Sequence, residues 1–386
     1  MYRTASLLLT LVASGCVTAQ DFVLDPPASD IIAADADDLY DSTTIVALAA
    51  DAAAADRLTA AATRYDLLSR DSLEAIGEEM MVFRIPGGTT GAQAIAELEG
   101  LEPGVTAGVN HAYRAGPSTG LPQGREYANA LLGWPGAGCR ALVPIGIIDT
   151  DLAMNTPALA GVNIVRKSFV SGGTAPDHGT AVAQLIAGPG RLNDARIFHA
   201  SVVGAAEGGT EAAGVDSLVR ALDWLQASGV RLVNVSLAGP YNKILDRGLQ
   251  AAANRGMVVV AAAGNTGRYG PPRYPAAFRQ TIAVTAVDAD LKPYQQSPEA
   301  QYLDIAAPGV DVFVPQGEGR YLSGTSVAAP FVTAVIAADP SASRLGSAEA
   351  LRAWLSSGAK DLGVPGEDKV FGAGLVQAGT ACHSGS

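Results

Sequence analysis

The sequence has little cysteine, histidine and charge, and each shortage narrows what the protein can be. Only 3 of its 386 residues are cysteine and 4 are histidine. No spacing of these residues matches a zinc site, so no metal is predicted. Charged residues make up 17% of the chain and hydrophobic residues 48%, which excludes a wholly disordered protein. The length suits about two domains.

Basic residues are in the minority. The 26 Lys and Arg stand against 38 Asp and Glu, giving a net charge of −12 without a basic cluster. This balance argues against a nucleic-acid partner. The imbalance is concentrated between Asp21 and Arg114, which holds 17 acidic and 5 basic residues. The front third of the chain is therefore an acidic appendage on a nearly neutral body.

Long apolar runs are also absent. None reaches the length of about 20 residues that a membrane span needs. The short run from Ala5 to Ala13 after Arg3 is typical of a secretory signal. Two kinds of processing stay open. Cleavage after Val17-Thr18-Ala19 would give a signal peptide over 1–19, whereas Ala13-Ser14-Gly15-Cys16 resembles a bacterial lipobox, which would lipidate Cys16. We expect export in both cases, to the medium or the periplasm, and membrane contact only if Cys16 is lipidated.

The two remaining cysteines, Cys139 and Cys382, are an even number in a compartment expected to be oxidising. A disulfide between the two ends of the body and a pair of free buried thiols both stay open.

The appendage divides into a linker and a small domain. Residues 20–59 are predicted to be an acidic, partly helical linker, with an alanine-rich helix from Ile45 to Leu68 overlapping its end. Residues 60–114 are predicted to form a small α+β domain, with strands at Met80–Ile85 and Val105–Tyr113. A helix from Thr90 to Leu98 lies between them, capped by Thr89 or Thr90. Residues 115–128 are rich in Gly, Pro and Ser and mark a boundary.

The body, residues 129–386, alternates apolar strands with helices. This pattern predicts a parallel sheet covered on both faces, an α/β architecture. Strands are expected at Val143–Ile148, Ile197–Val203, Val230–Leu237, Met257–Ala263, Thr281–Val287 and Leu303–Ala306. A helix from Val327 to Ala338 is expected to hold Pro330 in its first turn, where proline is tolerated.

Four polar residues stand where ligands bind in such sheets, beyond the carboxyl ends of the strands. Asp149 ends the first strand, His178 opens a helix, Asn265 follows the strand ending at Ala263, and Ser326 opens another helix. Consecutive members of this set are 29, 87 and 61 residues apart.

These four residues supply what acyl transfer needs. A serine hydroxyl needs an adjacent base, and a histidine can take its proton and return it to a leaving amine. A carboxylate orients the imidazole, and an asparagine amide can stabilise an oxyanion. Ser326 at a helix N-terminus adds its own backbone N–H. The remaining histidines, His111, His199 and His383, are interpreted as structural.

The chain order Asp, His, Ser and the residues around them resemble the subtilisin-like serine peptidases (subtilases, S8-type). The resemblance runs from about Val143 to Ala378. The matching segments are Ile145–Thr150, His178–Ala183, Asn234–Leu237, Ala262–Asn265, Ala306–Gly309, Gly324–Pro330 and Phe371–Leu375.

The resemblance implies a three-layer fold with a central, mostly parallel sheet and an exported serine endopeptidase acting on proteins or peptides. Asp149, His178 and Ser326 would be catalytic, and Asn265 would line the oxyanion hole. The substrate backbone would pair with Ser236, Leu237 and Ala238. One wall of the first specificity pocket would be Ala262, Ala263 and Gly264, whose small apolar surface favours an apolar residue before the scissile bond.

The resemblance also gives the appendage a role. Residues 60–114 would be a pro-region that assists folding, inhibits the enzyme and is removed by cleavage within 115–128. No cofactor is implied, and a structural calcium is left open.

Departures from the family pattern concern substrate preference more than activity. They include an extra carboxylate at Asp151, Ala238 where glycine is common, and Val327 in place of methionine. The alternative function is a catalytically silent exported scaffold of the same fold that binds peptides. An esterase of another fold is disfavoured because Ser326 lacks the Gly-x-Ser-x-Gly setting.

Overall fold

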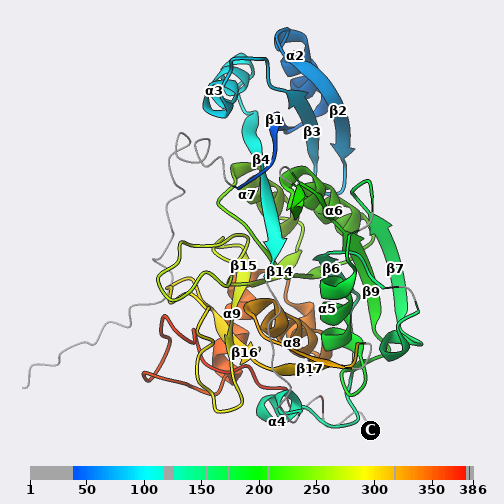
Figure 1. Cartoon of the computed structure of the whole chain (residues 1–386), viewed down its shortest axis with the longest axis vertical. Coiled ribbons are helices and arrows are strands. Elements are labelled where there is room, and N and C mark those ends of the chain that lie inside the picture. The colour runs from blue at the N-terminus through cyan, green and yellow to red at the C-terminus, as the bar shows by residue number, and fades with distance from the viewer. Residues whose placement is uncertain are drawn as a thin grey trace, which may run out of the picture.

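The computed structural model describes residues 38–116, 126–153, 155–172, 174–206, 209–316, 319–379 and 382. It has a small α+β unit at the N-terminal end and a larger α/β body (Figure 1). The predicted signal, Cys16 and most of the linker lie outside the described residues. Within these residues, no helix has the length and apolar character to cross a membrane.

The body is built on a parallel sheet of seven strands, as the apolar runs predict. Its order is β16-β15-β14-β12-β6-β9-β7, and every neighbouring pair is parallel. The strands are β6 (Ile145–Asp149), β7 (Asn163–Ser168), β9 (Arg196–Ser201), β12 (Leu232–Val235), β14 (Val258–Ala262), β15 (Thr281–Val287) and β16 (Ile305–Pro308).

Helices cover both faces of this sheet, so the body has three layers (Figure 1). Along β14, Val258 and Val260 face one apolar core, and Val259 and Ala261 face the other. The first core is closed by α4 (Ala128–Leu132), α5 (Asp177–Ala187), α8 (Thr325–Ala338) and α9 (Ala348–Gly358). The second is closed by α6 (Val215–Ala227) and α7 (Lys243–Ala253). The predicted α/β architecture is confirmed.

The small unit packs two helices on an antiparallel sheet of order β2-β3-β1-β4. Its elements are β1 (Leu39–Ala49), α2 (Ala52–Ala61), β2 (Asp66–Leu73), β3 (Glu78–Arg84), α3 (Gly91–Leu101) and β4 (Thr106–Ala115). Thr90 caps α3 and forms a capping box with Gln93, which confirms one of the two predicted caps.

The predicted helix from Ile45 to Leu68 is wrong, and the predicted linker of residues 20–59 overlaps β1 and most of α2. Strand β1 lies between β3 and β4, so both its edges are hydrogen-bonded. Ile45 and Ala47 pack towards α2 and α3, whereas Val46 and Leu48 pack on the body. A strand buried on both faces is a continuous apolar run, which periodicity cannot distinguish from a buried helix.

Strand β4 joins the two parts of the molecule, running from the small unit onto the body (Figure 1). Beyond its pairing with β1 it pairs antiparallel with two body strands, β11 (Glu211–Gly214) and β13 (Leu237–Ala238). Strand β10 (Val203–Ala205) extends this sheet beyond β11.

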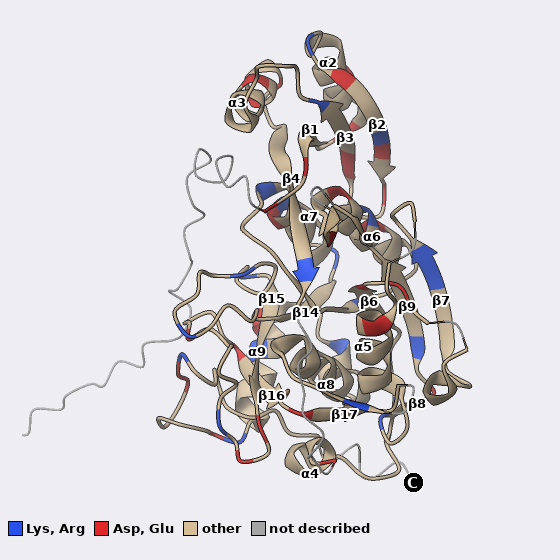
Figure 2. Ribbon diagram, viewed as in Figure 1, with Lys and Arg blue, Asp and Glu red and all other residues tan. Residues whose placement is uncertain are grey.

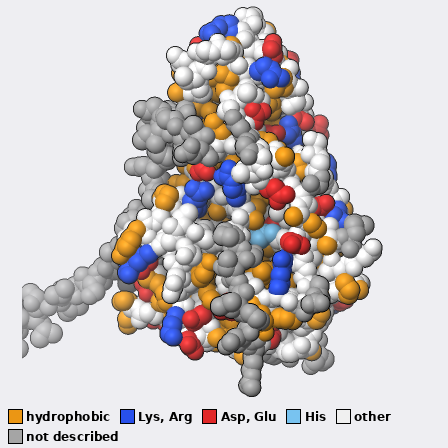
Figure 3. Space-filling view, viewed as in Figure 1, with side chains coloured by type: hydrophobic (Ala, Val, Ile, Leu, Met, Phe, Trp, Pro, Cys, Tyr) orange, Lys and Arg blue, Asp and Glu red, His pale blue; other side chains and the backbone are white. Residues whose placement is uncertain are grey.

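Opposite charges meet where the small unit rests on α6 and α7 (Figure 2). Arg220 pairs with Asp71 at 3.0 Å, and Arg247 pairs with Glu78 at 2.8 Å. Lys243 pairs with Glu99. On the face seen in Figure 3, acidic and basic side chains are interspersed near this junction. The acidic excess of the appendage is therefore partly matched by cations of the body.

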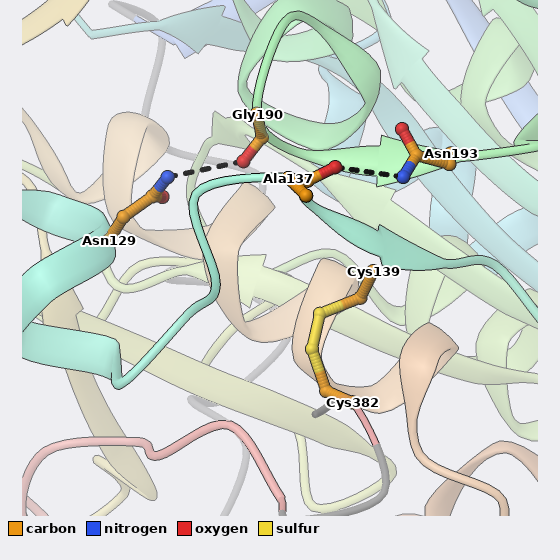
Figure 4. The surroundings of a disulfide bond; sticks show 6 residues. All are labelled: Asn129, Ala137, Cys139, Gly190, Asn193 and Cys382. Atoms are coloured by element: carbon orange, nitrogen blue, oxygen red, sulfur yellow. Dashed lines mark hydrogen bonds between the residues drawn. A yellow bond between two sulfur atoms is a disulfide. The ribbon is translucent and has the colours of Figure 1, made fainter. Parts of the chain in front are cut away.

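Short elements complete the body. They are β5 (Cys139–Arg140), which pairs with β8 (Leu192–Asn193), the hairpin β17 (Val312–Val314) and β18 (Arg320–Leu322), and the 3₁₀ turns η3 (Pro157–Leu159) and η5 (Ala342–Arg344). A disulfide joins Cys139 to Cys382, with 5.4 Å between their Cα atoms (Figure 4). It ties the start of the body to its C-terminal end, one of the two alternatives left open by the sequence.

Candidate active site

Asp149 and His178 form a hydrogen-bonded pair at the carboxyl edge of the sheet. Asp149 is the last residue of β6 and is fully buried, and His178 is the second residue of α5. His178 Nδ1 lies 2.7 Å from Asp149 Oδ1, and the backbone N–H of Thr150 donates to the same oxygen at 2.7 Å. The carboxylate therefore fixes Nδ1 of the ring, and Nε2 faces the other way.

Thr150 connects the two backbones that carry this pair. Its hydroxyl accepts the N–H of Gly179, the residue after His178, at 2.8 Å. A Cβ added to Gly179 would lie 2.5 Å from Thr150 O and 2.8 Å from Asp151 O. Glycine at this position therefore lets the strand end and the helix start come together.

His199 lies beneath the same loop, in the middle of β9. It is fully buried, and its Nε2 is 2.7 Å from the carbonyl oxygen of Thr150. A carbonyl only accepts hydrogen bonds, so Nε2 carries the proton. Burial lowers the pKa of His199 below its ordinary 6.5, opposed by the bond to Thr150 and by the charge of Asp149. The sequence alone indicates a structural role for His199, and the signal for its buried bond is the position of a histidine inside an apolar strand.

Ser326 is the second residue of α8 and is 4% exposed. The helix begins at Thr325, two residues earlier than predicted, so the expectation that Pro330 lies in the first turn is wrong. Pro330 has no N–H for the carbonyl oxygen of Ser326, four residues before it. Ser236 donates its hydroxyl proton to that oxygen at 3.0 Å. Asn234 in turn donates to Ser236 Oγ at 2.9 Å.

Asn265 is oriented by the start of α8. Its side-chain oxygen accepts both the backbone N–H and the hydroxyl of Thr325, each at 3.0 Å. The amide nitrogen therefore faces the other way. A Cβ built on Gly324 would lie 3.2 Å from Asn265 Nδ2 and 3.2 Å from Ser326 Oγ. These two atoms thus border one small space.

The two halves of the candidate site share one edge of the sheet. Helices α5 and α8 pack against each other, and both start at the carboxyl edge of the parallel strands. His178 and Ser326 are each the second residue of their helix. The four residues selected from the sequence are therefore held in two pairs, Asp149 with His178 and Ser326 with Asn265.

The predicted substrate-pairing residues are occupied by the chain itself. Leu237 pairs with Ala115 and Ala238 with Arg114, while on the other side of β4 Ala213 pairs with Tyr113. A Cβ added to Gly116 would collide with Asn265 Nδ2. The end of β4 therefore lies between two body strands and reaches the candidate oxyanion site. Ser236, the third predicted residue, is buried, and its hydroxyl bonds to the start of α8.

The ring of Tyr113 packs in the apolar core between α6, α7 and the sheet and lines a small cavity there. It is fully buried, and its hydroxyl donates to Pro240 O at 3.0 Å. Burial raises the pKa of this hydroxyl well above 10.0. A Cβ added to Gly239 would collide with the ring. Other side chains that line the cavity are Ile148, Leu218, Leu222, Val235 and Leu237.

Ala262, Ala263 and Gly264 are buried at the end of β14, next to the start of α8. Gly264 donates its N–H to Thr325 Oγ1 at 3.0 Å. Its φ of +99° is one that glycine favours, and a Cβ there would lie 2.8 Å from Cγ of Arg273. The predicted wall of small residues therefore lies beside the positively charged side chain of Arg273. In the part of the chain that the structure describes, no three His, Cys, Asp or Glu side chains gather as a metal site would need.

Comparison with known proteins identifies the family of this chain. Residues 142–374 match the model of the subtilase family. The chain belongs to the subtilase family. Subtilisin DY of Bacillus licheniformis is 33% identical over 260 residues, which are 63% of this chain and 92% of that protein. The M-protease of Shouchella clausii is 32% identical over 254 residues, and the matched part is 64% of its length. As a subtilase related to these proteases, the chain is a serine endopeptidase.

A solved structure extends the likeness of this subtilase beyond the body. Fervidolysin from Fervidobacterium pennivorans, a keratinolytic enzyme related to subtilisin, superposes with a TM-score of 0.71 at 20% identity. The superposition covers 89% of this chain and 61% of fervidolysin. At that identity the match shows the fold alone.

Proposed function

We propose that this subtilase is an exported endopeptidase that uses Asp149, His178 and Ser326 as its triad and is made as a self-inhibited pro-form. The observation that carries the proposal is the 2.7 Å bond between Asp149 and His178, at the sheet edge where α8 presents Ser326. Asn265, fixed through its oxygen, has its N–H groups left to stabilise an oxyanion.

The proposed reaction follows from these positions. His178 Nε2 takes the proton of Ser326 Oγ as that oxygen bonds to the substrate carbonyl carbon. Asn265 Nδ2 and the N–H of Ser326 stabilise the oxyanion. His178 then gives the proton to the leaving amine as the C–N bond breaks. A water molecule, deprotonated by the same histidine, then attacks the acyl carbon. The bond from that carbon to Ser326 Oγ breaks, His178 returns the proton to Oγ, and the carboxylate product leaves.

The small unit acts as the inhibitor in this proposal. Strand β4 pairs with β11 and β13 as an extended substrate would, and it ends against Asn265. Tyr113 anchors the strand in the apolar core, and the ion pairs on α6 and α7 orient the unit. The inhibitor therefore comprises at least residues 39–116, a longer segment than the 60–114 predicted from the sequence.

Export is proposed from the N-terminal sequence and fits the disulfide, because disulfides persist in oxidising compartments. Processing after Ala19 and lipidation of Cys16 remain the two routes.

Fluorophosphonate labelling of the purified protein followed by intact-mass measurement tests the proposal. We expect one label on the wild type, together with loss of the N-terminal unit. Ser326→Ala should show neither, and Ser357→Ala, at an exposed serine of α9, should behave as the wild type. A folded wild type that neither labels nor cleaves any peptide would contradict the proposal and support a silent peptide-binding scaffold.

A further inference from the structure

Arg273 is a largely buried cation beside β13, the body strand proposed to pair with the substrate. The next residue, Tyr274, exchanges two 2.9 Å backbone hydrogen bonds with Gly239, which directly follows β13. Arg273 Cβ and Cγ lie 3.0 and 2.8 Å from where a Cβ on Gly264 would be. Its side chain is only 17% exposed. The guanidinium therefore belongs to the wall that faces the end of β4.

The carboxylate that Arg273 contacts comes from the small unit. Arg273 Nη1 lies 3.5 Å from Asp38 Oδ2, and Asp38 Oδ1 accepts a hydrogen bond from Arg114 Nη1 at 3.1 Å. Arg114 is the β4 residue that pairs with Ala238. Two arginines, one on each side of the junction, thus share one carboxylate. Among the described residues no other carboxylate forms an ion pair with Arg273.

Removal of the small unit would take both Asp38 and Arg114 away from Arg273. A mostly buried guanidinium without a counter-charge is unfavourable in free energy. A substrate that binds there with an acidic side chain would therefore be favoured. A substrate strand that replaces β4 puts one of its own side chains where Arg114 stood. A glutamate there would bring its carboxylate to the place of Asp38, and an arginine there would be repelled.

We propose that Arg273 forms a carboxylate-binding subsite that selects an acidic side chain at the substrate position opposite Ala238. In β4 this position is held by Arg114, one residue after Tyr113 and two residues before Gly116. The inference rests on the proposed function for its role in substrate choice. The subsite itself can be tested without catalysis, because β4 occupies the same register in the full chain.

The binding test is a mutant cycle in full-length Ser326→Ala protein, which keeps the small unit attached. Asp38→Asn should lower the midpoint temperature of unfolding by about 2 °C, because Arg114 and Arg273 lose their shared partner. Adding Arg114→Glu should raise the midpoint temperature again, because the new glutamate would pair directly with Arg273. This recovery of the midpoint temperature should be lost when Arg273→Gln is added. It should be unchanged by Arg268→Gln, a substitution at an exposed arginine five residues before Arg273. Equal effects of Arg114→Glu with and without Arg273 would overturn the inference.

The cleavage test uses wild-type enzyme and quenched peptides with the core Tyr-X-Ala-Gly, where X is Glu, Gln or Arg. We expect kcat/KM to fall about three- to tenfold at each step from Glu to Gln to Arg, and less at high salt. Arg273→Gln should abolish this ranking and Arg268→Gln should keep it. Cleavage of all three peptides at equal rates would refute the subsite alone. Absence of any cleavage or labelling, with the mutant cycle intact, would refute the proposed function and leave the subsite supported.

Discussion

His199 donates a hydrogen bond from its buried Nε2 to the carbonyl oxygen of Thr150, 2.7 Å away, directly behind the pair of Asp149 and His178. Thr150 also bonds to Asp149 Oδ1 and to the N–H of Gly179. One buried histidine thus supports the residue that links the carboxylate of Asp149 to α5. This relationship makes His199 a positioning residue for the proposed triad.

His199→Phe keeps the ring volume and removes the donor, leaving Thr150 O buried and unsatisfied at a cost of about 1–3 kcal/mol. We expect kcat to fall about tenfold, the order of one lost hydrogen bond, with KM nearly unchanged. His199→Gln offers an N–H at a similar reach and should recover most of kcat. Steady-state kinetics with urea unfolding checks this. Equal kcat values per folded molecule in both variants and the wild type would refute a positioning role.

Stability should depend on pH through the same residue. Burial lowers the pKa of native His199 below 6.5, whereas the unfolded chain takes up this proton near 6.5. Below that pH the unfolded state binds more protons, so the free energy of unfolding falls as the pH is lowered. Asp149, Asp151 and Arg166 are the charged groups that act on the ring. Unfolding measured from pH 8 to 5 should show a shallower loss for His199→Gln. Parallel curves for the two proteins would contradict this assignment.

Ser236 should stabilise the start of α8, because Pro330 has no N–H to donate to the carbonyl oxygen of Ser326. Ser236→Ala removes the donor to Ser326 O, and we expect a loss of about 1–3 kcal/mol in stability together with a lower kcat. Pro330→Ala in the same chain supplies the missing helical N–H and should restore part of both. Thermal unfolding and the rate of fluorophosphonate labelling measure the two effects. If Pro330→Ala lowers both quantities further, the carbonyl of Ser326 is not the affected group.

Tyr113 should hold the small unit on the body. Tyr113→Ala removes the ring from the apolar core, a change that costs about 3–5 kcal/mol for a large buried aromatic side chain. In full-length Ser326→Ala protein we expect faster amide hydrogen exchange in β4 and β13. Tyr113→Phe keeps the ring, loses only the bond to Pro240 O, and should stay close to the parent. Unchanged exchange in β4 after Tyr113→Ala would show that the ion pairs of α6 and α7 hold the unit instead.

Much of the fold and the candidate site could be predicted because it is encoded in short segments. The strands of the body are continuous apolar runs, and Asp149, His178, Asn265 and Ser326 stand at the ends of elements whose order is distinctive. The family follows from those same segments. The same segments supply the roles proposed for Asp149, His178, Asn265 and Ser326, and the labelling experiment tests the role of Ser326.

Other features depended on contacts between distant segments. The run from Ile45 to Ala49 became a strand because β3 and β4 pair with it on either side. The start of α8 at Thr325 put Pro330 beyond the first turn and gave Ser236 its partner 90 residues away. No local pattern signals either outcome.

The sequence by itself therefore determined the class of fold, the family and the candidate chemical groups, because apolar periodicity and short motifs are local properties. Only the tertiary structure decided that β4 pairs with both β11 and β13, that His199 supports Thr150, and that Asp38 meets Arg273 from 235 residues away. Such contacts are decided by which surfaces pack together, and packing is a property of the whole folded chain.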